Sequence, residues 1–80
     1  MTVKELNDVL AKERKLYLKG KDIDGPFGIN ACKDSVEYKL ISGKSLKQIY
    51  IELVNRALKD EPGFNHTMIF ACELMMEEAR

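Results

Sequence analysis

The fold of this protein is decided by residues 67–76, which read Thr-Met-Ile-Phe-Ala-Cys-Glu-Leu-Met-Met. Wound as an α-helix, this stretch is apolar on two sides. Phe70 and Leu74, four residues apart, form one stripe. The broader face consists of Met68, Ile69, Cys72, Met75, Met76 and Ala79. Because a surface helix needs only one apolar face, the pattern predicts a helix packed on both sides, by its own chain or by another copy.

The methionines of this helix allow two interpretations. The simpler one places them in the core, because methionine fills irregular gaps. The sharper hypothesis is an adaptable interaction surface, since flexible thioethers suit variable partners. The residues of that candidate surface are Met68, Phe70, Leu74 and Met75. Three aromatic side chains can instead cover Phe70 and Leu74 from within the chain, namely Tyr17, Phe27 and Tyr38.

The length predicts one small helical domain over residues 1–80. A core of this size rarely contributes more than about 3–5 kcal/mol net, so small domains often add a disulfide, a metal or a second subunit. The charged start carries no secretory signal and no stretch approaches a membrane span, which predicts a cytoplasmic chain. Cys32 and Cys72 are then expected to be reduced and buried, with a disulfide as the minority alternative.

Charge argues against a nucleic-acid partner, because thirteen basic and thirteen acidic residues cancel. The charge is nevertheless uneven along the chain. Basic residues cluster at Lys12, Arg14, Lys15, Lys19 and Lys21, and the C-terminal segment is acidic at Glu73, Glu77 and Glu78. Solvated helix faces are the simpler interpretation. The alternative is a basic patch that meets an acidic partner or the acidic tail of a second copy.

Three helices are predicted directly, near residues 3–17, 45–60 and 66–80. Thr2 with Glu5, and Ser45 with Gln48, match the capping-box pattern at two helix starts. The 45–60 helix has the most regular apolar stripe, which predicts that it is the central core helix. The short connection after it predicts an antiparallel neighbour in the 66–80 helix.

Glu13 falls in the middle of the apolar stripe of the first helix, where a lone buried carboxylate is costly. Three explanations remain open. The helix ends near Lys12, the side chain extends to solvent, or the carboxyl meets a buried partner. The first two are favoured.

Residues 31–41 match two patterns. As a helix, this segment places Cys32, Val36 and Leu40 at four-residue spacing, but its other apolar residues scatter around the wheel. As a strand, the segment alternates apolar residues (Val36, Tyr38 and Leu40) with charged ones (Glu37 and Lys39), which is the better match to a regular period. We therefore predict a mainly α bundle of three to four helices. The alternative is an α+β fold with a minor two-strand hairpin at about 15–19 and 35–41.

Two functional motifs are incomplete. Residues 35–58 resemble a helix-turn-helix, with Lys44, Lys47 and Gln48 as weak DNA-contact candidates, but the net charge of zero argues against it. His66 and Cys72 are candidates for a small metal or Cys/His site, although their spacing of six is not a helical neighbour spacing.

No catalytic constellation assembles in the sequence, and no catalytic residue, metal or cofactor is predicted. The doubly apolar C-terminal helix favours a non-enzymatic interaction or regulatory module. We expect it to act through a partner protein or as a homodimer, away from membranes. The helix-turn-helix protein and the metal or Cys/His site protein are the two alternatives.

Overall fold

The computed structural model describes residues 1–79 and contains four helices. They are α1 (Val3–Leu18), α2 (Ile29–Ile41), α3 (Leu46–Leu58) and α4 (Thr67–Glu78). The prediction of a mainly α bundle is confirmed. The alternative with a hairpin is wrong, because residues 15–18 belong to α1, residues 35–41 belong to α2, and residues 1–79 form no strand.

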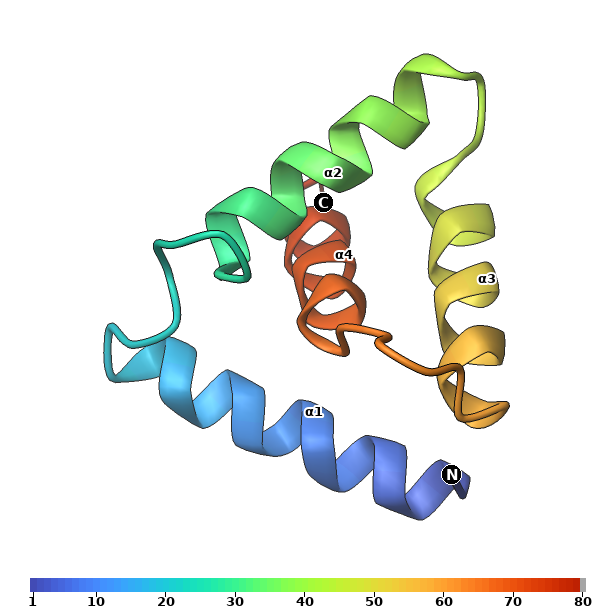
Figure 1. Cartoon of the computed structure of the whole chain (residues 1–80). Coiled ribbons are helices and arrows are strands. Elements are labelled where there is room, and N and C mark those ends of the chain that lie inside the picture. The colour runs from blue at the N-terminus through green and yellow to red at the C-terminus, as the bar shows by residue number, and fades with distance from the viewer. Residues whose placement is uncertain (80) are drawn as a thin grey trace.

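The centre of the bundle is α4, which the other three helices surround (Figure 1). It contacts α2 most extensively, then α3 and α1, whereas α1 and α2 do not contact each other. The prediction that the 45–60 helix is the central one is therefore wrong. The physical reason is that α3 has one apolar stripe, whereas α4 buries residues all around its axis, namely Thr67, Ile69, Phe70, Ala71, Cys72 and Leu74.

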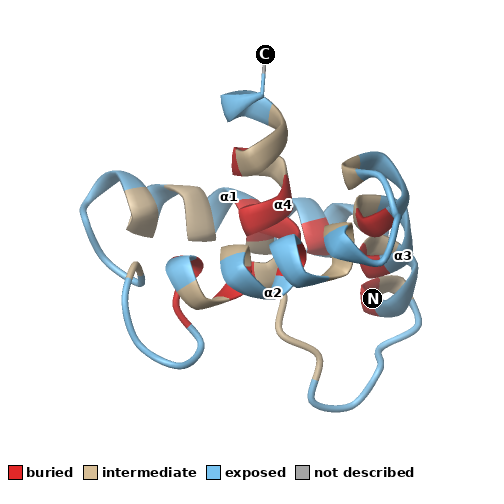
Figure 2. Ribbon diagram, turned by 90° about the horizontal axis from the view of Figure 1, so that it is seen from above, coloured by how far each residue is buried: buried red, intermediate tan, exposed pale blue. Residues whose placement is uncertain are grey.

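The outer helices each turn one buried stripe toward α4, and their other sides are exposed (Figure 2). These stripes are Leu6 and Leu10 in α1, Ile29, Cys32 and Val36 in α2, and Ile49, Leu53 and Ala57 in α3. None of the four helices formed by residues 1–79 combines the length and apolar character that crossing a bilayer requires.

Local hydrogen bonds fix where the helices begin. Both predicted capping boxes are present: the Glu5 amide donates to Thr2 Oγ1 at 3.1 Å, and the Gln48 amide donates to Ser45 Oγ at 3.1 Å. In return, the backbone amides of Thr2 and Ser45 donate to the side chains of Glu5 and Gln48. At the start of α4, Asn65 Oδ1 accepts from the Thr67 amide at 3.1 Å. These bonds satisfy amides that a helix start leaves unpaired.

Residues 31–41 are helical because a helix gives them a buried stripe, whereas a strand at this position has no partner. Ile29, Cys32 and Val36 recur at helical spacing and pack toward α4. The residues that scatter off this stripe, Tyr38 and Ile41, are left in solvent.

The loop at residues 19–28 returns to the start of α2 through close backbone contacts. The Ile29 amide donates to the Asp22 carbonyl and the Asn30 amide to the Ile23 carbonyl, both at 2.9 Å. Gly28 lies inside this turn, where a Cβ atom would stand 2.5 Å from the Asp24 carbonyl oxygen. The turn therefore requires glycine at this position for steric reasons, even though the φ of −75° is ordinary.

Gly28→Ala is expected to lower the free energy of unfolding by about 2–3 kcal/mol, because the added methyl group displaces backbone rather than a flexible side chain. Gly20→Ala is the matched control. Gly20 has a φ of +74° but open space around it. Gly20→Ala should therefore lower the free energy of unfolding by only about 1 kcal/mol, because alanine disfavours this backbone conformation. Urea unfolding followed by circular dichroism measures both. A smaller loss at Gly28 than at Gly20 contradicts the steric argument.

Candidate interaction surface

The second apolar stripe of α4 is covered from within the chain. Phe70 is fully buried, and Leu74 is nearly so. The Tyr17 ring meets Phe70 edge-on at 5.7 Å between centroids, and the Arg14 guanidinium lies 5.0 Å above the Phe70 ring. The hypothesis that Phe70 and Leu74 belong to an interaction surface is corrected here, because both are core residues. Of the three aromatic candidates, Tyr17 provides the cover, whereas Phe27 and Tyr38 remain exposed.

Ion pairs hold the acidic end of α4 against its own chain. Arg14 Nη2 lies 2.7 Å from Glu77 Oε1 and 3.6 Å from Glu73 Oε2. Lys33 Nζ lies 2.7 Å from Glu78 Oε1. Arg14 therefore secures Phe70 in two ways, by stacking on its ring and by clamping the following turns of α4. These pairs give intramolecular partners to an acidic segment that could otherwise have met a second copy.

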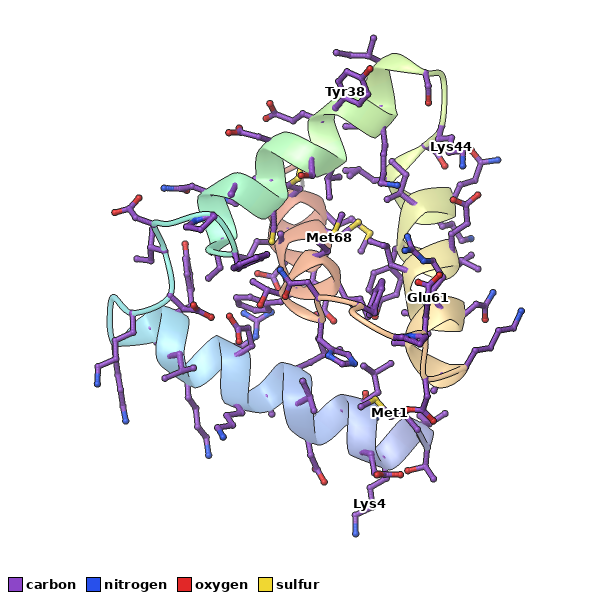
Figure 3. All side chains as sticks on the ribbon, in the orientation of Figure 1. Met1, Lys4, Tyr38, Lys44, Glu61 and Met68 are labelled. Carbon is purple, nitrogen blue, oxygen red and sulfur yellow. The ribbon has the colours of Figure 1, made fainter. Side chains whose placement is uncertain are left out.

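The two methionines of the candidate interaction surface do not form an exposed patch either. Met68 and Met75 are half-buried and pack against the core. Figure 3 places Met68 in the middle of the bundle, on α4. The four candidate residues of the interaction surface are thus two core side chains and two that line the core.

The DNA-contact candidates lie where the chain passes from α2 into α3. Lys44 Nζ pairs with Glu52 at 2.9 Å, and the Gln48 side chain is engaged in the capping box of α3. Figure 3 shows Lys44 at this connection. Lys47 is exposed. Two of the three candidate side chains, Lys44 and Gln48, are already engaged in an ion pair or a hydrogen bond within the chain. They are therefore less available to contact DNA, and the geometry does not favour the helix-turn-helix alternative.

The structure does not bring His66 and Cys72 together in a site. The His66 ring packs edge-on against Phe64, with 5.4 Å between centroids, and the Cys72 thiol donates to the Leu46 carbonyl at 3.6 Å. Burial raises the pKa of Cys72 to about 11, so the thiol is protonated near neutral pH and is a poor nucleophile. Within residues 1–79, no group of His, Cys, Asp or Glu side chains has the arrangement of a metal site, and no pocket is present.

Both cysteines are free thiols and both are buried. This agrees with the expectation of reduced, buried cysteines. The Asn65 side-chain amide donates to Cys32 Sγ at 3.5 Å, and burial raises the pKa of Cys32. Both side chains lie in the packed interior, with exposed fractions of 4% and 0%.

The most exposed apolar side chains lie elsewhere, on the outer side of α2. Tyr38 and Ile41 are 78% and 83% exposed and occupy adjacent turns, pointing away from Val36 and the core. Figure 3 shows Tyr38 on the outside of the bundle. Leu18, at the end of α1, is also exposed. The sequence pattern names Tyr38 only as a possible cover for Phe70 and Leu74, and it gives Ile41 and Leu18 no role. The apolar residues of 31–41 that fall off the helical stripe are the signal that points to Tyr38 and Ile41.

Glu13 is placed against a second carboxyl group. Because α1 continues to Leu18, the explanation that the helix ends near Lys12 is wrong. Glu13 Oε1 is buried and has no hydrogen-bond partner within residues 1–79, whereas the side chain as a whole is half-buried, so the carboxyl is only partly in solvent. Burial, followed by the nearby Asp22 carboxyl, raises the pKa of Glu13 to about 7, and the Thr67 side chain acts in the opposite direction.

Comparison with known proteins gives no match to this chain among family models, curated proteins or solved structures. Its own residues must therefore carry any functional argument.

Phe70→Ala is expected to reduce the free energy of unfolding by about 3–5 kcal/mol, because it leaves a cavity under Tyr17 and Arg14. Tyr38→Ala is the control for an exposed aromatic residue and should change stability by less than about 0.5 kcal/mol. Urea unfolding of both variants measures the difference. Equal losses would contradict the placement of Phe70 in the core.

The Glu13 carboxyl predicts that stability falls between about pH 4.5 and 7, because the folded protein retains a proton that the unfolded chain releases. Glu13→Gln should match the wild type near pH 5 and exceed it at pH 8. The gain is about 1–2 kcal/mol, since solvent screening reduces the effect at this half-buried side chain. Thermal unfolding across this range measures it, with the exposed Glu37→Gln as control. Parallel profiles for wild type and Glu13→Gln would refute the carboxyl pair.

Proposed function

We propose that this protein is a small, non-enzymatic interaction or regulatory module that binds another protein chain through the outer face of α2. The observation that supports it is the pair Tyr38 and Ile41, two large apolar side chains about four-fifths exposed on adjacent turns. Adjacent exposed apolar residues with a polar border are typical of protein-binding surfaces, and tyrosine is enriched in them.

The position of these residues favours a binding role over a packing role. The core side of α2 is complete without them, since Ile29, Cys32 and Val36 already face α4. Tyr38 and Ile41 therefore contribute little to folding, and leaving both in water forgoes about 1.5–3 kcal/mol of burial for each. A partner chain that covers them recovers this free energy.

Two acidic residues beside Tyr38 and Ile41 make this surface negatively charged. Asp34 and Glu37 are exposed on the same outer side of α2, and neither forms an ion pair within residues 1–79. The surface therefore suits a partner with apolar side chains bordered by basic ones.

Photo-crosslinking tests the proposed surface. A photoreactive phenylalanine analogue replaces Tyr38 in the native host, and the same analogue replaces Lys47, an exposed residue of α3, as the control. We expect a covalent adduct with a protein chain at position 38 and none at position 47. Ile41→Ser, which should leave thermal stability unchanged, should reduce the yield of the adduct. The proposal fails if position 38 gives no adduct or if both positions react equally.

A further inference from the structure

We propose that the chain covering the outer face of α2 is a second copy of this protein, which docks there with the outer face of its α1. This inference rests on the proposed function and names its partner. It follows from two exposed surfaces of one chain that have opposite charge and an apolar centre.

The first surface is the acidic face of α2, consisting of Asp34, Glu37, Tyr38 and Ile41. All four side chains are exposed. Asp34 precedes Tyr38 by four residues and Ile41 follows it by three, so these three lie along one side of the helix. Its carboxylates are available to basic groups from outside the chain.

The second surface is the basic face of α1, consisting of Lys12, Lys15 and Leu18 together with Lys19, the residue that caps the end of the helix. Its members are all exposed, and Leu18 is 75% so. The lysines follow one another at spacings of three and four, which places them on one side of the helix beside Leu18. None of them forms an ion pair within residues 1–79, whereas the neighbouring Arg14 is occupied by Glu77.

These surfaces are complementary. Each offers apolar side chains next to unpaired charges of one sign, and the signs are opposite. Because the whole chain has no net charge, copies do not repel one another at long range. Contact between the two surfaces pairs lysines with carboxylates and removes Leu18, Tyr38 and Ile41 from water together.

The position of the two surfaces determines the form of the assembly. α1 and α2 lie on opposite sides of α4 and do not contact each other (Figure 1). A two-fold dimer needs both surfaces in one continuous patch. Two different surfaces on opposite sides instead give head-to-tail contacts, which continue into a chain or close into a ring. The assembly therefore exceeds a dimer as the concentration rises.

Sedimentation velocity of the purified full chain tests the contact. We expect the average mass to rise above that of a dimer with increasing concentration at low salt, and to fall at high salt as the charges are screened. Tyr38→Ser with Ile41→Ser should weaken association by about tenfold or more.

A charge exchange tests which surfaces meet. Lys15→Glu with Lys19→Glu makes both surfaces acidic, and Asp34→Lys with Glu37→Lys makes both basic. Each double variant alone should be monomeric. An equal mixture should assemble, because every α1 surface then finds an α2 surface of opposite sign. Lys47→Glu with Lys59→Glu is the control: it changes net charge as much as the first variant does, at exposed lysines outside both surfaces, and should assemble like the wild type.

The outcomes separate this inference from the proposed function. A wild-type chain that remains monomeric at low salt overturns the inference, and so does a mixture of the exchanged variants that fails to assemble. Loss of assembly in the Lys47 and Lys59 control overturns it too, because net charge would then be the cause. A monomeric chain whose position 38 still crosslinks to a different protein in the host leaves the proposed function standing.

Discussion

The enclosure of α4 is the constraint on which the rest of this structure depends. Its buried residues point in every direction around the helix axis, so no single neighbour can cover them. A chain of this length covers such a helix only by distributing its other three helices around it. That requirement separates α1 from α2 and gives each of them one buried stripe and one side in solvent (Figure 2).

This arrangement decides which apolar side chains are left over. Phe70 and Leu74 are in the central helix, where a neighbour is available on every side. Tyr38 and Ile41 are in an outer helix, which has a neighbour on one side only. The apolar residues of α4 are therefore buried, although the sequence concentrates them there, and the apolar side chains that remain exposed are in the outer helices. The proposed function rests on these exposed side chains.

Polar groups at the border of the core have two different consequences. Arg14 stabilises the enclosure, because its guanidinium covers Phe70 and its charge is paired with Glu77. Glu13, one residue earlier, opposes folding when ionised, because Oε1 is buried and the Asp22 carboxyl nearby further disfavours a negative charge. Two adjacent residues of α1 therefore act in opposite ways: Arg14 stabilises the packing of α4, and Glu13 makes the stability of the fold depend on pH near neutrality.

The sequence by itself determined what depends on neighbours a few residues away. Capping by Thr2 and Ser45 and the helical spacing of the apolar residues are local. The three helices predicted near 3–17, 45–60 and 66–80 are found at Val3–Leu18, Leu46–Leu58 and Thr67–Glu78, and residue 80 of the last prediction lies outside the described residues. Only the tertiary structure decided the environments of Phe70, Glu13 and Tyr38. The cover over Phe70 comes from Arg14 and Tyr17, more than fifty residues earlier. Periodicity shows that a side chain is apolar, but its burial depends on which distant helix packs beside it.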